Sequence, residues 1–228
     1  MNVLAIQTAL KSAGFDPGNL DGVWGRRTIS AVEAFQKAHN LDVDGVVGPQ
    51  TSGVLFAGAG ATASILDVPP WYSIALRKMG LNEVRDKAAL MFFLKSDGNA
   101  LGDPSKLPWC GDFVETCVAL ALPKEPMVDN PYYALNWLRF GKPLGKNDFY
   151  RGAVAVFQRD GGGHVAFVAG HDATTVHTLG GNQSNSVSIS KVAKARLVGL
   201  RWPATYPFPT GNPLPETSFD GTITTNEA

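Results

Sequence analysis

A cysteine at the start of a predicted helix is the first residue here whose type and position could do chemistry. Cys110 lies in the segment PWCGDFV, residues 108–114, and the apolar spacing that follows predicts a helix over 110–122, ended by Pro123. In the first turn of a helix, unpaired backbone amides favour a thiolate and can stabilise an oxyanion. Cys110 is therefore a candidate nucleophile, and a buried structural cysteine is the alternative.

The second cysteine has a different place on the same predicted helix. Cys117 falls on its apolar face, which favours a core position. Two helical turns separate it from Cys110 by about 10 Å, too far for a disulfide. The sequence has no CxxC pair, no HExxH motif and no acidic loop of the calcium type, so we expect no metal site.

A histidine could serve as the base for this cysteine. His164 follows three glycines and opens the apolar run 164–169, which is predicted to be a strand. At the mouth of a strand that faces a helix N-terminus, it would lie within hydrogen-bond reach of Cys110. The alternative is a surface histidine without a catalytic role.

The elements around these two positions predict an α+β domain over residues 70–205. Helices are expected at 71–79, 83–95 and 110–122, and strands at 153–157, 164–169 and 175–179. Short turns that contain glycine separate the strands, which indicates an antiparallel sheet.

The order of these motifs resembles a known family. Trp-Cys-x-x-Phe-Val on a helix, then Gly-His-Val at the start of a strand, resembles the CHAP family and related papain-like cell-wall hydrolases. The resemblance implies a papain-like fold, Cys110 as nucleophile, His164 as base and no cofactor. In that family a polar residue from the next strand, or from its end, orients the histidine.

Two residues are candidates for that orienting role. The segment LGGNQ, residues 179–183, resembles a signature of a phage and prophage branch of the family, as does Arg201-Trp202-Pro203. This implies Asn182 as the orienting residue, because an amide oxygen can accept the imidazole N–H. The alternative is His177, on the strand where the sister group of papain-like hydrolases carries its third polar residue. Trp109 is either a wall of the substrate cleft or a core residue.

The N-terminal part of the chain carries an internal repeat. DGVWG at 21–25 is followed by Thr28, and DGVVG at 44–48 is followed by Thr51. Apolar residues at helical spacing precede each copy, and a short helix is expected after the second. Residues 1–57 are therefore predicted to form an all-α, three-helix domain.

The paired D-G-x-x-G-x-x-T motif resembles the peptidoglycan-binding domain found at the ends of many cell-wall enzymes. The resemblance implies peptidoglycan as the partner. The candidate wall-binding residues are those of the motif: Asp21, Gly22, Trp24, Asp44 and Gly45. For Trp24 the sequence favours a core position over a platform for a sugar.

Composition bounds the remaining segments and the partners. Residues 58–69 are rich in Gly, Ala and Pro and are predicted to be a linker, and residues 206–228 an extended or disordered tail. Twenty Lys and Arg balance twenty Asp and Glu, so we expect no nucleic-acid partner. The apolar stretch 53–66 is too short for a membrane span, so we expect no stable membrane association. We also expect a monomer.

Together these features predict a peptidoglycan hydrolase that cuts an amide bond of the stem peptide, as an endopeptidase or as an N-acetylmuramoyl-L-alanine amidase. The order of domains resembles a phage endolysin. The first ten residues lack the pattern of a signal peptide, so we expect the host cytoplasm, with action on the wall after the membrane is breached. The alternatives are a non-catalytic cell-wall-binding or virion structural protein, and a lysozyme-type glycosidase. The glycosidase would need two carboxylates across a cleft, and Asp112 and Glu115 stand three apart on one helix.

Overall fold

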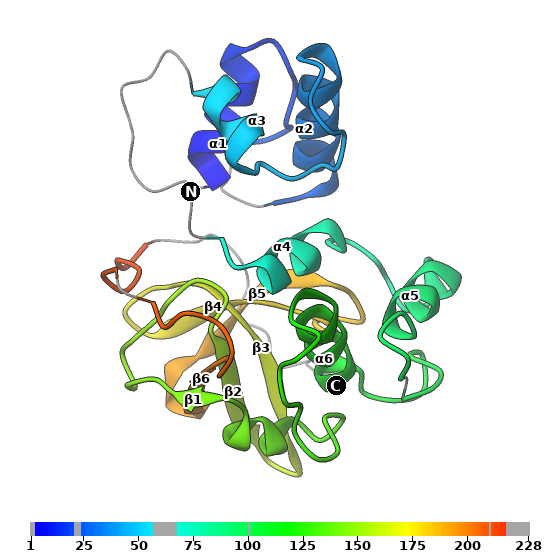
Figure 1. Ribbon diagram of the computed structural model, residues 1–228, viewed down its shortest axis with the longest axis vertical. Helices are drawn as coiled ribbons and strands as arrows, with labels where there is room; N and C mark the ends of the chain where they lie inside the picture. Colours follow the sequence, from blue (N-terminus) through cyan, green and yellow to red (C-terminus); the bar gives the residue numbers. More distant parts are fainter. Residues whose placement is uncertain (1–2, 21–23, 57–67, 100, 210, 218–228) are drawn as a thin grey trace. The chain divides into compact units, whose positions relative to one another are not determined.

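The computed structural model describes residues 3–20, 24–56, 68–99, 101–209 and 211–217. The chain divides into two compact units, Met1–Val68 and Pro69–Ala228 (Figure 1). Of the predicted linker 58–69, only residues 68 and 69 lie within the described residues. No helix in the described ranges has the length and apolar character needed to cross a bilayer.

The N-terminal unit is helical. Its helices are α1 (Val3–Ser12), α2 (Arg26–Ala38) and α3 (Pro49–Leu55). Apolar side chains that recur every three or four residues point inward and form its core, which includes Ile6, Leu10, Trp24, Ala31, Val32 and Phe35. The helical character predicted for this part of the chain is confirmed.

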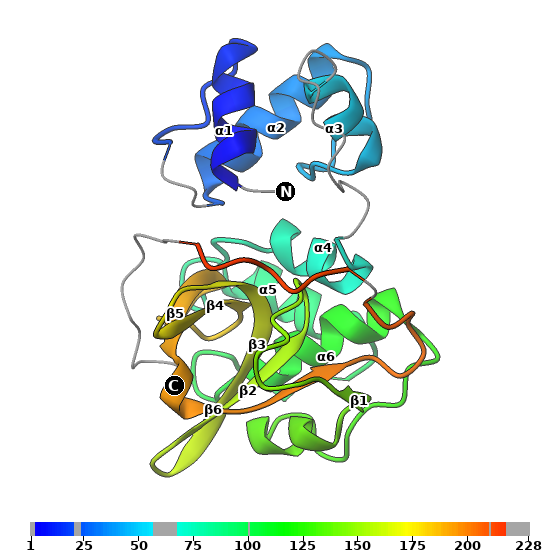
Figure 2. The ribbon, with the colours of Figure 1, turned by 90° about the vertical axis from the view of Figure 1, so that its left-hand side faces the viewer.

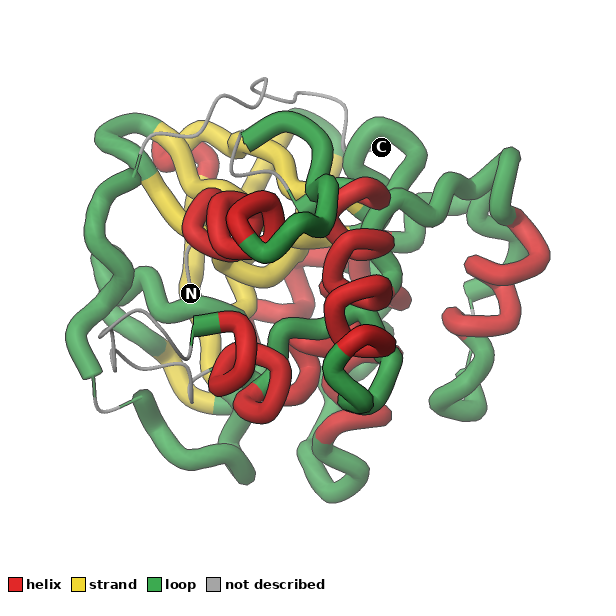
Figure 3. The backbone as a smooth tube through the Cα atoms, turned by 90° about the horizontal axis from the view of Figure 1, so that it is seen from above, coloured by secondary structure: helices red, strands yellow, loops and turns green. Residues whose placement is uncertain are grey.

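The C-terminal unit contains all the strands of the described chain (Figure 3). They are β1 (Lys142–Pro143), β2 (Val154–Arg159), β3 (Gly162–His171), β4 (Thr175–Gly180), β5 (Ser188–Ala193) and β6 (Leu197–Trp202). The strands form one antiparallel sheet in the order β1-β6-β2-β3-β4-β5. The three predicted strands correspond to β2, β3 and β4, and the antiparallel sheet is confirmed. Strands β1, β5 and β6 were not predicted from the sequence.

Three α-helices and two short 3₁₀ helices accompany the sheet. They are α4 (Pro70–Arg77), α5 (Lys87–Leu94), α6 (Cys110–Ala121), η1 (Ala134–Arg139) and η2 (Lys194–Arg196). Helix α6 contacts β3 and β4, and both α4 and α5 contact α6 (Figures 1 and 2). Residues 110–118 of α6 are all buried, so this helix is central to the unit.

The second predicted helix begins four residues later than expected. Its expected first turn is instead a side-chain turn in which the Asn82 carbonyl accepts hydrogen bonds from the backbone N–H groups of Val84 and Arg85. Asn and Asp side chains commonly compete with helical hydrogen bonding in this way. The helix therefore starts at Lys87, after Asp86.

The described part of the predicted tail is extended, and hydrogen bonds join it to the sheet domain. Leu214 donates its backbone N–H to the carbonyl of Phe149, and Thr217 donates to that of His171. The Trp202 indole donates to the Pro207 carbonyl at 2.9 Å. Residues 206–209 and 211–217 thus belong to the C-terminal unit (Figure 2), while residues 210 and 218–228 lie outside the described residues.

Candidate active site and wall-binding module

Cys110 is the first residue of α6, and its side chain is buried, with 3% of the residue exposed. Burial raises the pKa of the Cys110 thiol, because a thiolate loses hydration there. Backbone N–H groups of Val165 and Gly111 and the Arg159 guanidinium oppose this rise in pKa. The resting thiol is therefore neutral near pH 7, so a nucleophilic role needs a base beside it.

Gly111 allows another segment to cross the start of α6. A Cβ atom at this position would lie 2.1 Å from the Pro131 carbonyl oxygen. That carbonyl also accepts a hydrogen bond from the Trp137 indole at 2.8 Å. Close packing thus requires a glycine after the cysteine. The segment that crosses at Pro131 covers the first turn of the helix.

His164 lies on β3, is fully buried and pairs across the sheet with Phe157 of β2. Val165, the next residue, is the one whose N–H lowers the pKa of Cys110. The structure thus brings the two predicted catalytic positions together. The Nε2 atom of His164 is 3.2 Å from Oε1 of Gln183. An amide oxygen only accepts, so Nε2 carries the hydrogen, and in the neutral ring Nδ1 is the acceptor.

The amide of Gln183 is held in one orientation. Its Nε2 donates to the backbone carbonyls of Thr178, at 3.0 Å, and Ser188, at 2.5 Å. Its Oε1 accepts from the Thr178 hydroxyl at 2.7 Å. Because these carbonyls occupy the nitrogen end, the oxygen end faces the histidine. Gln183 therefore fixes the tautomer of His164, which is the function that the sequence analysis assigned to Asn182.

Asn182 occupies the turn that makes this possible. Its φ is +57°, a left-handed conformation that asparagine tolerates better than most residues. The two glycines before it pass close to other groups: a Cβ on Gly180 would meet Ala166, and one on Gly181 would meet Trp109 and Phe113. The turn points the next side chain, that of Gln183, toward His164. The assignment of Asn182 as the histidine's partner is therefore corrected to Gln183.

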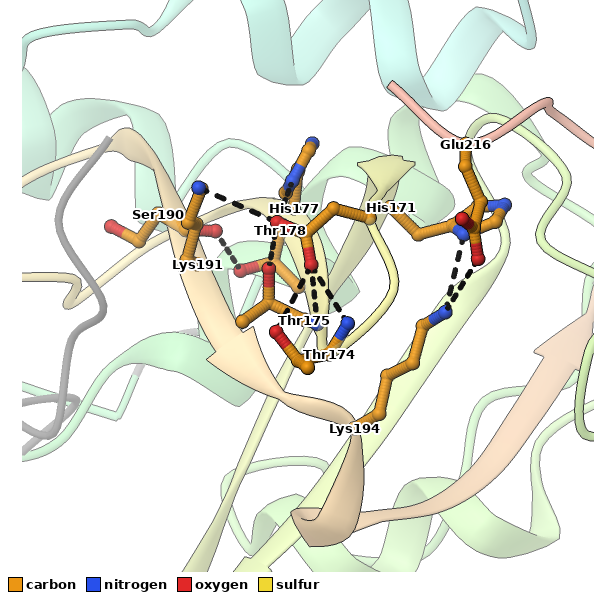
Figure 4. A network of polar contacts seen from close by, with 10 residues as sticks. His171, Thr174, Thr175, His177, Thr178, Ser190, Lys191, Lys194 and Glu216 are labelled. Carbon is orange, nitrogen blue, oxygen red and sulfur yellow. Dashed lines mark hydrogen bonds and ion pairs between the residues drawn. The ribbon is translucent and has the colours of Figure 1, made fainter. Parts of the chain in front are cut away.

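His177 contacts a different set of groups. Its Nε2 is 3.2 Å from Oδ2 of Asp172, and Lys191 lies 3.4 Å from the same oxygen (Figure 4). Burial lowers the pKa of His177, and the hydrogen bond to Asp172 opposes that shift. Side chains alternate along a strand, so His177 and Thr178, which holds Gln183, lie on opposite faces of β4. The geometry gives no support to His177 as the orienting residue.

An open pocket of about 310 Å³ borders the cysteine segment. Its lining residues are Glu83, Pro104, Ser105, Lys106, Leu107, Pro108, Arg159 and Asn182. Trp109 is not among them. It is fully buried, and its indole donates to Oε2 of Glu83 at 2.9 Å. Trp109 is thus a core residue whose indole holds the Glu83 carboxylate of the pocket. Of the two alternatives for Trp109, the core position is the one observed, and the cleft wall is not.

Other predicted functions depend on carboxylates or metal ligands. Asp112 and Glu115 are buried, 1% and 4% exposed, and neither lines the pocket. A pair that flanks a sugar bond across a cleft is thus not formed by these two residues. Within the described ranges, no group of three or more His, Cys, Asp or Glu side chains is arranged to hold a metal ion.

The second copy of the repeat in the N-terminal unit folds around a buried glutamine. Gln36 donates through Nε2 to Asp44 at 2.7 Å and to Thr51 at 3.0 Å, and its Oε1 accepts from the backbone N–H of Gly45 at 2.9 Å. Gly45 has a φ of +68°, which glycine adopts at low cost. Asp44 and Gly45 thus shape the turn.

In the first copy, too, a buried glutamine of the preceding helix donates to the threonine of the motif. Gln7 of α1 donates to the Thr28 hydroxyl at 3.2 Å, and both residues are buried. Trp24 is 3% exposed, so it belongs to the core and not to a sugar platform. Asp21 and Gly22 lie outside the described residues. The motif residues that are described therefore have structural roles.

The comparison with known families concerns this N-terminal unit. Residues 2–55 match the family described as "Putative peptidoglycan binding domain". This unit is therefore of the peptidoglycan-binding class, and peptidoglycan is the partner that the match supports. The match covers the whole repeat and associates the chain with the cell wall.

Proposed function

We propose that this protein is a peptidoglycan amidohydrolase, in which the N-terminal unit binds the wall and the C-terminal unit cuts an amide bond of the stem peptide. The observation that carries the proposal is the arrangement of three buried side chains. Cys110 begins a helix, the residue after His164 offers its N–H to the cysteine, and Gln183 fixes the histidine tautomer. This is the arrangement that a thiol nucleophile and a base require.

These positions support the following reaction. Nδ1 of His164 takes the thiol proton as Sγ of Cys110 attacks the amide carbon, and the backbone N–H of Cys110 stabilises the oxyanion. His164 then protonates the leaving amine, which leaves a thioester. Water, with His164 as base, hydrolyses the thioester and restores the thiol. Gln183 stabilises the imidazolium that forms in each half of the cycle.

The papain-like fold and the endolysin-like role are parts of the same proposal. A helix with an N-terminal cysteine against an antiparallel sheet that carries the histidine is consistent with the CHAP resemblance. In this role the chain would reach the wall from the host cytoplasm once the membrane is breached. Endopeptidase and N-acetylmuramoyl-L-alanine amidase activities both fit the site, and mass spectrometry of murein digested by the protein would identify the bond cut.

Two competing functions receive less support. A non-catalytic wall-binding or virion structural protein would give no reason for the buried contact between His164 and Gln183. A lysozyme-type glycosidase would need exposed carboxylates, whereas Asp112 and Glu115 are buried away from the pocket.

Cys110→Ser tests the proposal in the full chain with purified murein sacculi. We expect lysis, measured by turbidity, to fall at least about 100-fold, because a neutral hydroxyl is a much poorer nucleophile than a thiol beside the same base. Cys117→Ser is the matched control, since Cys117 is buried on the same helix, and it should keep the activity at a modest cost in stability. Lysis by Cys110→Ser at the wild-type rate would refute the proposal.

A further inference from the structure

The pocket beside Cys110 carries an excess of positive charge. Arg159 and Lys106 line it, against one carboxylate, that of Glu83. The indole of Trp109 already engages Glu83. Pro108, two residues before Cys110, and Asn182, next to Gln183, also line the pocket, so it borders the candidate site. The positive charge of Arg159 acts to lower the pKa of the Cys110 thiol.

Both cations are available to a ligand. Among the ion pairs between described residues, none involves Arg159 or Lys106. A neighbouring cation shows the contrast: Lys87 pairs with Asp103 at 2.6 Å and lowers the pKa of that carboxyl group to about 2. The loop that carries Lys106 thus contains the Asp103 carboxylate, but this carboxylate is already paired with Lys87.

Asn182 adds an independent feature. It is 1% exposed and lines the pocket, and its Nδ2 has no hydrogen-bond partner among the described residues. A buried amide N–H without a partner costs free energy unless a ligand or a water accepts from it. Because Gln183 is the residue that contacts His164, Asn182 is left to face the pocket.

We propose that this pocket is a subsite for a free carboxylate of the peptide substrate, bound by the Arg159 guanidinium and the Asn182 amide N–H, with Lys106 at the rim. The inference rests on the proposed function, and it makes the substrate an acidic peptide that is cut next to a residue with a free carboxylate. Charge-assisted hydrogen bonds of this kind give both affinity and orientation. They would position the scissile amide over Cys110.

The test compares two synthetic substrates in the full chain: an N-acetylmuramoyl stem tetrapeptide with free carboxylates, which contains both the amidase bond and the bonds of the stem peptide, and its analogue with every carboxylate converted to a carboxamide. We expect wild type to cleave the free acid with a kcat/KM about tenfold higher or more, the scale of one charge-assisted hydrogen bond. Arg159→Met should abolish this preference, and Arg159→Lys should keep most of it. Asn182→Asp, which exchanges the donor for a carboxylate, should reverse it. Lys146→Met, on an exposed cation away from the pocket, is the matched control.

The outcomes separate the two proposals. Equal cleavage of both substrates by wild type, or a preference that survives in Arg159→Met, would overturn the subsite while leaving the hydrolase in place. If wild type cleaves neither muramoyl peptide, at the amidase bond or within the stem, the hydrolase proposal fails. Calorimetric binding of both peptides to Cys110→Ala then decides the subsite: tighter binding of the free acid, lost when Arg159→Met is added, supports it, and equal binding overturns it.

Discussion

The Gln183 side chain determines which nitrogen of His164 carries a hydrogen. Three of its contacts hold the amide so that only the oxygen faces the ring: two with backbone carbonyls and one with the Thr178 hydroxyl. The histidine is buried, so no solvent competes for Nε2. In the proposed mechanism Gln183 is therefore a positioning residue that acts on the thiol through the histidine.

Gln183→Ala should lower kcat by about 10- to 10⁴-fold, the range expected when a triad loses the member that orients its base. The pH profile should change as well, because the acidic limb reports the pKa of the histidine in the enzyme. Gln183→Glu, which keeps an acceptor toward Nε2, should recover part of the loss. Peptide hydrolysis at several pH values measures both effects.

His177→Ala is the comparison variant, since His177 is another buried histidine of the same sheet, on the opposite face of β4, and it bonds to Asp172. We expect it to lose stability and to keep kcat within about threefold at temperatures where it is folded, the scale of a change remote from the chemistry. A crippled His177→Ala together with a fully active Gln183→Ala would contradict the assignment.

The sequence was sufficient to predict where Cys110 and His164 lie, at the start of a helix and on a strand, because each occupies a position that its own element defines. The third residue was not predictable in the same way. Asn182 and Gln183 are both amides that follow a strand, and alternation no longer applies in the turn. A signal was present in the residue types: asparagine tolerates a left-handed φ better than glutamine does, so Asn182 makes the turn and Gln183 reaches the site.

At the scale of elements, helix α6 carries two buried acidic residues, Asp112 and Glu115, whose charged forms are disfavoured by burial. Burial and the nearby carboxylates of Asp97 and Asp112 raise the pKa of Glu115 to about 7, and burial raises that of Asp112 to about 6. A carboxyl group whose pKa is higher in the folded state than in the unfolded state favours folding while it is protonated. That contribution is complete below the unfolded pKa near 4.5 and is lost as the pH rises through about 7.

Glu115→Gln should therefore stabilise the C-terminal unit at pH 8 by about 1 kcal/mol, or about 2–4 °C in Tm, because the amide avoids a buried charge. At pH 4.5 the two proteins should unfold at nearly the same temperature. Calorimetry of the full chain at both pH values measures this difference. Asp129→Asn, at an exposed acid of the same unit, should show no such dependence, and an equal gain at both pH values for Glu115→Gln would exclude the titration as its cause.

The elements themselves were predictable where the local pattern was strong. Helices α4 and α6 and strands β2 to β4 follow from apolar runs and their glycine or proline ends. Strands β5 and β6 carry charged residues such as Lys191 and Arg201 within short apolar runs. β6 pairs with β2 across about 40 residues of chain, and such pairing depends on tertiary contacts that a local pattern does not contain.

At the scale of the whole molecule, the chain consists of two units with separate cores. Each has a distinct assignment: the N-terminal unit matches a peptidoglycan-binding family, and the proposed chemistry lies in the C-terminal unit alone. Tethering a catalytic unit to a binding unit raises its effective concentration at the wall without any new contact.

Residues 1–68 alone should thus sediment with purified sacculi, and residues 69–228 should not. The isolated C-terminal unit should retain its rate on soluble peptides within about threefold but lose about tenfold or more on intact sacculi, since the tether is absent. Pelleting assays and turbidity assays measure the two properties. Equal sedimentation of both units, or undiminished lysis by residues 69–228, would contradict this division.

The buried and neutral state of Cys110 has a consequence for the chemical durability of the protein. Peroxide and other oxidants attack the thiolate far more readily than the thiol, and they need access to it. In the proposed mechanism the proton leaves the sulfur as a substrate carbonyl arrives, so the thiolate would exist only during a turnover. On that mechanism, burial and the bound proton protect the Cys110 sulfur from conversion to a sulfenic acid between turnovers.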